Sequence, residues 1–327
     1  DDQEARLVVL SSEFPYAKDG ESPAEKAAKG ILASRGNAPR LYQNTLVFLA
    51  ADKVRLQDLD EALRKVLAWE SILAEKEALD LSPHQVRQAE MQRKSADDTV
   101  VGRLPETYQW LLAPEQPSPQ APVTWKATKV TGSDALAARA SKKLRSDELL
   151  VTTLGPTILK KHLDEVPLWR GDHVPVRQLV DDFARYLYLP RLLGPQVLAR
   201  AVSDGIRLLT WRSDGFAFAE SHDESVPRYR GLRCGEAVEV SPESAGLVVK
   251  PDVAHRQLEE ETKAAERKAA EPAGSGTEAS TPAGGRSGPG RPVAEKPVVR
   301  LRRFHGTVAL DPTRVTRDVG TIANEVI

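Results

Sequence analysis

The residue best placed for phosphate chemistry is Asp52, which directly follows the apolar run 46–51. An acidic residue at the end of such a strand can orient Mg²⁺ in a P-loop nucleotide site. However, Lys53 stands where a catalytic Glu would be expected, and the sequence has no GxxxxGK[ST] phosphate loop. We therefore expect Asp52 to be a helix N-cap or loop residue, with a magnesium ligand as the alternative.

Arginines form the second group of residues with a recognisable chemistry. Four of them lie on or beside a predicted helix at 197–206 and the turn after it, where a DNA-binding unit would contact phosphates: Arg191, Arg200, Arg207 and Arg212. Nearby acidic residues would oppose such contacts, namely Asp181, Asp182 and Asp204. A scaffold role for this region is the alternative to DNA contact.

The remaining reactive residue types do not form a complete centre. Trp169, Tyr186, Tyr188 and Trp211 lie in apolar runs, which favours core packing over base stacking. Neither the histidines nor the one cysteine, Cys234, has metal-ligand spacing, so we assign no metal site. No arrangement of Ser, His and Asp or of paired carboxylates points to nucleophilic or acid–base catalysis.

Composition limits the function classes further. A formal net charge of −1 excludes a uniformly basic nucleic-acid coat, so any such binding depends on local clusters. A single cysteine excludes an internal disulfide and fits a reducing cytosol. The apolar runs are far shorter than the roughly 18 residues of a membrane span, so we expect a cytoplasmic protein with no membrane partner.

The elements predicted for residues 1–53 are those of an α/β core. A strand at 6–10, a helix at 22–34 and an uninterrupted apolar strand at 45–49 follow one another, as in a parallel sheet. Residues 54–122 are then predicted to be an all-helical lid. Its helices are expected from residue 53 onward and at 82–94 and 108–112, and the proline-rich stretch 114–122 marks its end.

A mixed region at 123–253 is predicted to contain helices at 133–143, 155–166, 176–187 and 197–206. Strand-like arms at 206–211 and 216–219 around Ser213, Asp214 and Gly215 suggest a hairpin, and with the helix pair they indicate a winged-helix-like module at 166–221. Residues 254–298 are expected to be a charged helix and a disordered linker. Residues 299–327 are expected to be a truncated α/β module.

Four segments, taken in order, resemble a bacterial family of large ATP-binding proteins, domain-of-unknown-function family 499. They are residues 40–52 (RLYQNTLVFLAAD), 166–172 (VPLWRGD), 186–192 (YLYLPRL) and 303–308 (RFHGTV). Related ATPases sit beside DNA methyltransferases in phage-defence islands. The resemblance implies the C-terminal part of an AAA+-like P-loop ATPase, with ATP and Mg²⁺ held mainly by residues upstream of Asp1.

In such an ATPase, Asn44 would sense the terminal phosphate and Arg40 would neutralise charge during phosphoryl transfer, with Arg35 as an equal competitor. A turn residue and a solvated side chain are the alternatives. The sequence begins without Met and ends in an apolar stripe, so we expect a piece of a longer polypeptide that does not hydrolyse ATP alone.

Two functions follow as expectations. The first is ATP turnover coupled to DNA-related phage defence, with DNA, further copies of the chain and other defence proteins as partners. The second is a non-enzymatic interaction or DNA-binding scaffold that recruits a partner such as a DNA methyltransferase.

Overall fold

The computed structural model describes residues 3–18, 22–132 and 134–270, of which 268–270 are described by their backbone alone. All of these residues belong to one compact unit, Asp1–Pro272. The predicted linker after residue 270 and the predicted module at 299–327 therefore lie outside the described residues. Among the helices of the described part, none is both long and apolar enough to cross a bilayer.

The predicted strand, helix and strand at the start of the chain are confirmed. β1 (Arg6–Val9) pairs in parallel with β4 (Leu46–Ala51), and α1 (Pro23–Ala33) connects them. A short hairpin of β2 (Ser34–Arg35) and β3 (Ala38–Pro39) follows α1. Every residue of β4 is buried, as expected for a central strand with both faces covered.

The predicted helix at 108–112 is wrong. β5 (Tyr108–Glu115) runs through it, pairs antiparallel with β4, and pairs on its other side with β6 (Thr124–Lys129). The resulting sheet has the order β1-β4-β5-β6, and the proline-rich stretch forms the turn between β5 and β6. A short apolar run fits a buried helix or a buried strand equally well, so periodicity alone could not decide between them.

The two faces of the sheet are covered by different helices. On one face, Ala24, Ala28 and Leu32 of α1 pack against Phe48 and its neighbours on alternate strand positions. On the other face, α4 (Leu136–Ser146) packs against Val47, Leu49 and Leu111. This alternation follows from the two-residue side-chain period of a strand.

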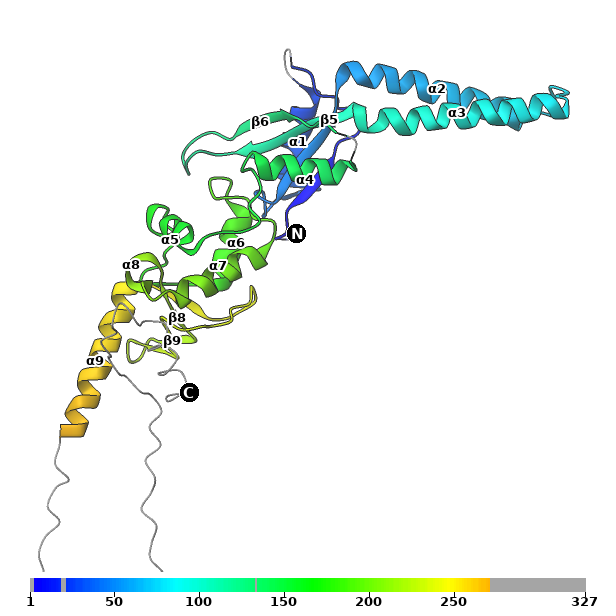
Figure 1. Ribbon diagram of the computed structural model, residues 1–327. Helices are drawn as coiled ribbons and strands as arrows, with labels where there is room; N and C mark the ends of the chain where they lie inside the picture. Colours follow the sequence, from blue (N-terminus) through cyan, green and yellow to red (C-terminus); the bar gives the residue numbers. More distant parts are fainter. Residues whose placement is uncertain (1–2, 19–21, 133, 271–327) are drawn as a thin grey trace, which may run out of the picture. The chain divides into compact units, whose positions relative to one another are not determined.

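Two long helices lie side by side and point away from the sheet, and we call them the arm (Figure 1). They are α2 (Lys53–Ala74) and α3 (Pro83–Thr107), which pack against each other along their lengths. A capping box, in which the Ser82 hydroxyl and the Gln85 side chain bind each other's backbone amides, starts α3. The predicted helix from residue 53 is confirmed, whereas the one predicted to end at 94 continues to Thr107.

The remaining elements form a unit of helices around a small antiparallel sheet. Its helices are α5 (Pro156–Glu165), α6 (Val176–Arg185), α7 (Pro195–Arg207) and the one-turn α8 (Trp211–Asp214). Its sheet has the order β7-β11-β8, built from β7 (His173–Pro175), β8 (Ala217–Ala219) and β11 (Leu247–Val249). A hairpin of β9 (Ser221–Asp223) and β10 (Arg228–Arg230) lies between β8 and β11 in sequence.

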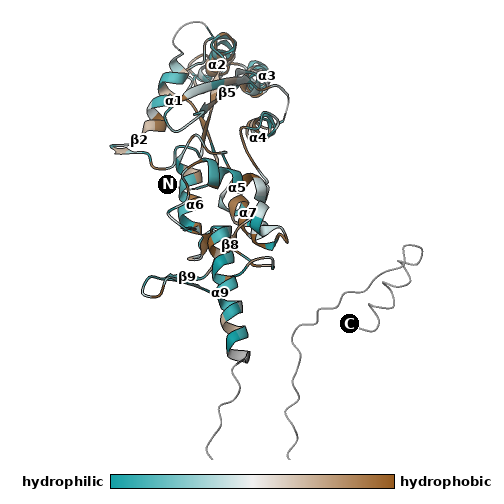
Figure 2. Cartoon of the chain, turned by 90° about the vertical axis from the view of Figure 1, so that its left-hand side faces the viewer, coloured by the Kyte–Doolittle hydropathy of each residue, from teal (hydrophilic) through white to brown (hydrophobic). Residues whose placement is uncertain are grey.

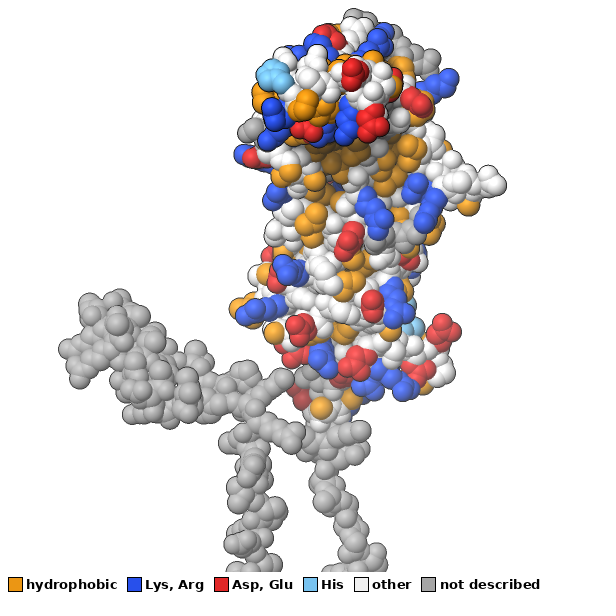
Figure 3. Space-filling view, turned by 90° about the vertical axis from the view of Figure 1, so that its right-hand side faces the viewer, with side chains coloured by type: hydrophobic (Ala, Val, Ile, Leu, Met, Phe, Trp, Pro, Cys, Tyr) orange, Lys and Arg blue, Asp and Glu red, His pale blue; other side chains and the backbone are white. Residues whose placement is uncertain are grey.

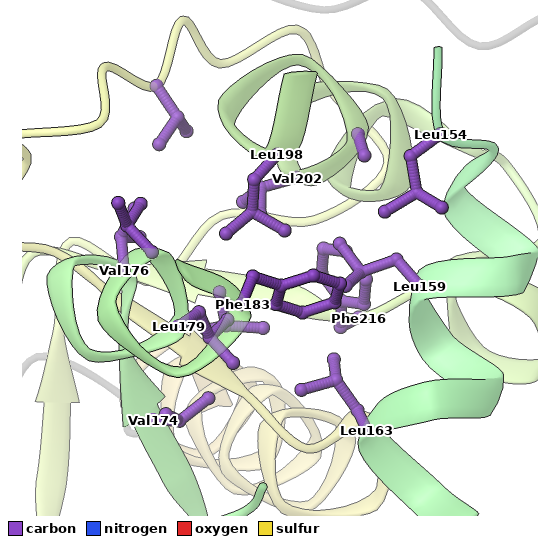
Figure 4. Close-up of a cluster of buried hydrophobic side chains, with 14 of the residues drawn as sticks. Leu154, Leu159, Leu163, Val174, Val176, Leu179, Phe183, Leu198, Val202 and Phe216 are labelled. Carbon is purple, nitrogen blue, oxygen red and sulfur yellow. The ribbon is translucent and has the colours of Figure 1, made fainter. Parts of the chain in front are cut away.

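These elements share one hydrophobic core. The rings of Phe183 and Phe216 lie at its centre, with Leu159 of α5 and Leu198 of α7 directed toward them (Figure 4). The predicted helices at 155–166, 176–187 and 197–206 are thereby confirmed to within a few residues. Beyond this core, α9 (Pro251–Ala270) is mostly hydrophilic (teal in Figure 2).

The hairpin predicted around Ser213, Asp214 and Gly215 is wrong. Residues 206–211 complete α7 and enter α8, and β8 pairs with β11 about thirty residues later in the chain. α7 approaches the start of β8 closely, which explains Gly205 of α7 and Gly215 before β8. A Cβ at Gly205 would lie 2.5 Å from the Phe216 ring. A Cβ at Gly215 would likewise clash with the carbonyl oxygen of Gly205, so the glycine before β8 serves packing between elements and not a tight hairpin turn.

Candidate functional site

Asn44 is buried just before β4, and its side chain binds the backbone of the α6 region. Its amide nitrogen Nδ2 donates hydrogen bonds to the carbonyl oxygens of Phe183 and Leu189, both at 3.0 Å. Its backbone N–H also donates to the carbonyl of Ala184 at 2.9 Å. The group expected to sense a phosphate is therefore occupied in joining the sheet to the helical unit.

Arg191 is buried beside Asn44 and is saturated by backbone carbonyls. Its guanidinium donates from Nε to Asn44 at 2.9 Å, from Nη1 to Leu149 at 3.1 Å and from Nη2 to Pro114 at 2.7 Å. Burial lowers the pKa of Arg191 to about 10, so the side chain keeps its charge at neutral pH. In this position it does not reach a nucleic-acid phosphate, and we assign it a structural role in place of the predicted contact. We call Asn44, Arg191 and their carbonyl partners the junction.

Arg40 is directed toward a different part of the molecule from Asn44. Its Nε donates to the carbonyl of Ile31 near the end of α1 at 2.8 Å, and burial and the nearby Arg35 lower its pKa. Arg35 itself is exposed on β2. The side chains of Arg40 and Asn44 therefore bind the carbonyls of different segments, and the structure does not bring the two groups together.

Asp52 is the N-cap of α2, as predicted. One carboxylate oxygen accepts hydrogen bonds from the backbone N–H groups of Val54 at 2.9 Å and Arg55 at 3.1 Å. The other accepts from the indole nitrogen of Trp110 at 2.8 Å. Burial by itself would raise the pKa of Asp52, but these three hydrogen bonds outweigh it and lower the pKa below the usual range. Both carboxylate oxygens thus serve structural contacts, one in the cap of α2 and one to Trp110.

Three of the four predicted DNA-contacting arginines are exposed on the helical unit. Arg200 and Arg207 lie on α7 and Arg212 on α8, and within the described part of the chain none of them has an ion-pair or hydrogen-bond partner. Gln196, Arg200, Asp204 and Arg207 follow one another at three- and four-residue steps, so they share the outer face of α7. The opposite face of α7 is buried in the core.

The basic side chains of the β9–β10 region differ, because each is paired with a carboxylate. Arg228 pairs with Glu261 at 2.8 Å, Arg233 pairs with Glu220 at 3.1 Å, and Arg230 pairs with Asp223. These pairs are exposed, so each contributes little to stability and can exchange for a phosphate. Each of these arginines is held in an ion pair, whereas Arg200 and Arg207 form none and share their helix face with Asp204.

Sequence reasoning missed a cluster of three rings at the base of the β9–β10 hairpin. His173, His222 and Tyr229 pack together, and Nδ1 of His173 lies 3.0 Å from the Tyr229 hydroxyl. Burial, and then the proximity of His222, lower the pKa of His173, which favours a neutral ring. Over residues 3–18, 22–132 and 134–270, no three His, Cys, Asp or Glu side chains are grouped so as to hold a metal ion. The three rings lie on strands of three residues each, which are too short for an alternation of buried and exposed side chains to be recognised in the sequence.

No protein-family model, curated protein or solved structure matches the chain. The arrangement of its own side chains is therefore what bears on function.

Replacing Arg191 tests the junction. In Arg191→Met, three buried carbonyls lose their donor, and we expect the free energy of unfolding to fall by about 3–5 kcal/mol. Denaturant unfolding of the full chain measures this change. The control is Arg200→Met, whose exposed side chain should change the value by no more than about 0.5 kcal/mol. Equal stability of the two variants would contradict the structural role of Arg191.

The cap at Asp52 makes a prediction about pH. Because the folded protein lowers the pKa of Asp52, the stabilisation is present above the unfolded-state pKa of about 4 and is lost as pH falls through the folded-state value. Asp52→Ala should cost about 1–2 kcal/mol of unfolding free energy at pH 7, and the difference should shrink below about pH 4. Denaturant unfolding across this pH range measures it. Asp98→Ala, at an exposed position of α3, should show no such pH dependence.

Proposed function

We propose that residues 156–249 are a winged-helix-type unit that binds double-stranded DNA and is carried on the α/β sheet. The order of elements supports this: helix α5, strand β7, helices α6 and α7, strand β8, an intervening hairpin and strand β11. The sheet order β7-β11-β8, in which the last strand lies between the first two, also fits a winged-helix unit. In this comparison the segment 220–246, with its β9–β10 hairpin, takes the place of the wing.

The observation that carries the proposal is the outer face of α7. As the second helix of the α6–α7 pair, α7 corresponds to the helix that enters the major groove in helix-turn-helix proteins. Gln196, Arg200 and Arg207 span about 16 Å along the helix at 1.5 Å per residue, and a major groove about 12 Å wide admits an α-helix. Asp204 on the same face is the one charge that opposes a phosphate contact. Sequence-independent phosphate binding by Arg200, Arg207 and Arg212 therefore fits better than detailed base readout.

A second candidate is the ATPase implied by the resemblance to family 499. The observation in its favour is the parallel pair β1 and β4 joined through α1, because strand–helix–strand units of this kind build nucleotide-binding cores. In this proposal the phosphate loop and the magnesium ligands belong to residues outside this sequence. The chain alone should then show no binding of a fluorescent ATP analogue with Mg²⁺, and tight binding would contradict the proposal.

DNA binding is tested with Arg200→Ala/Arg207→Ala in the full chain. We expect weaker affinity for a duplex of arbitrary sequence, and a salt dependence whose slope falls by about one unit for each lost phosphate contact. Electrophoretic or anisotropy titrations at several salt concentrations measure both. Arg87→Ala, at an exposed arginine of α3 in the arm, is the matched control and should leave affinity unchanged. An affinity and slope identical in the double variant and the wild type would rule out α7 as the contact surface.

A further inference from the structure

The arm buries one seam between its helices and leaves the rest of both helices in solvent. Along α3 the covered positions recur at alternating steps of three and four residues: 86, 89, 93, 96, 100, 103 and 107. Along α2, Leu59, Ala62, Val66 and Trp69 follow the same spacing. This is the heptad pattern of a two-helix coiled coil, in which hydrophobic side chains outside the seam have no partner within the arm.

Two ion pairs identify the flanks of the seam. Arg93 meets Glu70 at 3.6 Å, whereas Arg103 meets Asp58 at 3.8 Å. Helical spacing puts Leu63 and Leu67 of α2 on the Glu70 side, at seven and three residues before it. It puts Val101 and Leu104 of α3 on the Arg93 side, at eight and eleven residues after it. Because Glu70 and Arg93 touch, these four side chains lie along one flank, which we call the flank patch.

The flank patch is unusually exposed for aliphatic residues. Leu67 and Val101 are 62% and 66% exposed, and Leu63 and Leu104 are each 42% exposed. The ion pairs fix the register so that the four residues lie within about 14 Å along the arm at 1.5 Å per residue. Exposed aliphatic side chains along the flank of two paired helices can receive a third, amphipathic helix.

Acidic residues lie on the same flank of the arm, level with the patch and beyond it toward the tip. Glu90 and Asp97 lie seven residues apart on the same flank as Leu104, and Asp98 is adjacent. None of the three forms an ion pair among the described residues. Two basic residues lie between Glu90 and Asp97: Arg93, which pairs with Glu70, and Lys94. On the α2 side Asp60 and Arg64 neutralise each other at 2.8 Å. The end of the arm likewise presents mixed charges with hydrophobic side chains among them (Figure 3).

We propose that the flank patch is a docking surface for an amphipathic helix of a partner protein, with aliphatic residues on its inner face and Lys or Arg at its edges. The four aliphatic side chains supply the buried area, and the unpaired acids favour a basic partner. A second copy of the chain fits less well, because a two-fold contact through the patch brings the unpaired acids of two arms toward each other.

The test uses the full chain and two synthetic amphipathic helices of about four turns. Both peptides carry Leu on one face; one has Lys and the other has Glu at the remaining positions. We expect the Lys peptide to bind, and Leu67→Asp/Val101→Asp to weaken its affinity at least about tenfold in fluorescence anisotropy. Because Asp adds negative charge, a purely electrostatic attraction would instead be strengthened.

Met91→Asp is the matched control, since Met91 is an exposed aliphatic residue of α3 on a different face of the arm. It should bind the Lys peptide as tightly as the wild type does. Equal binding of both peptides, or an equal loss in the Met91 variant, would overturn the proposal. So would self-association in sedimentation, or binding to phosphatidylcholine vesicles, that the double variant abolishes, because the occupant would then be a second copy or a membrane.

Discussion

The buried guanidinium of Arg191 connects the parts of the described chain. Removing such a charge from water costs several kcal/mol, and three charge-assisted hydrogen bonds to carbonyls offset that cost. The carbonyls belong to Asn44, two residues before β4, to Pro114 in β5 and to Leu149 in the segment after α4. The side chain of Asn44 in turn donates two hydrogen bonds to carbonyls of the helical unit. Leu187 adds an apolar contact by packing into the core on the α1 face of the sheet.

The junction constrains any function of α7. The segment with Arg191 continues through Leu193, whose carbonyl accepts a hydrogen bond from Ala5 just before β1. α7 starts at Pro195, two residues after Leu193. The hydrogen bonds of Arg191 and Leu193 therefore hold the beginning of α7 close to the sheet. A duplex bound on the outer face of α7 would therefore have a fixed orientation relative to the sheet, without a hinge between the binding face and the α/β core.

The sequence predicted the parts of the fold that depend on local patterns. The six apolar residues of β4, the apolar stripes of α6 and α7 and the cap at Asp52 each have a signature in neighbouring residues. The roles of Asn44 and Arg191 have none, because their partners are backbone carbonyls as far as 147 residues away. Every residue carries the same backbone carbonyl, so the residue type does not indicate which carbonyl will accept a hydrogen bond. The segments at 108–112 and 206–211 were misassigned because apolar runs of five or six residues suit either a helix or a strand.

The arm is joined to the sheet without loops. α2 begins one residue after β4 ends, with only Asp52 between them, and β5 begins directly after α3. The two helices of the arm are thus continuations of two hydrogen-bonded central strands. No flexible segment separates the arm from the sheet. A force applied near the tip of the arm therefore acts directly on strands β4 and β5 in the middle of the sheet.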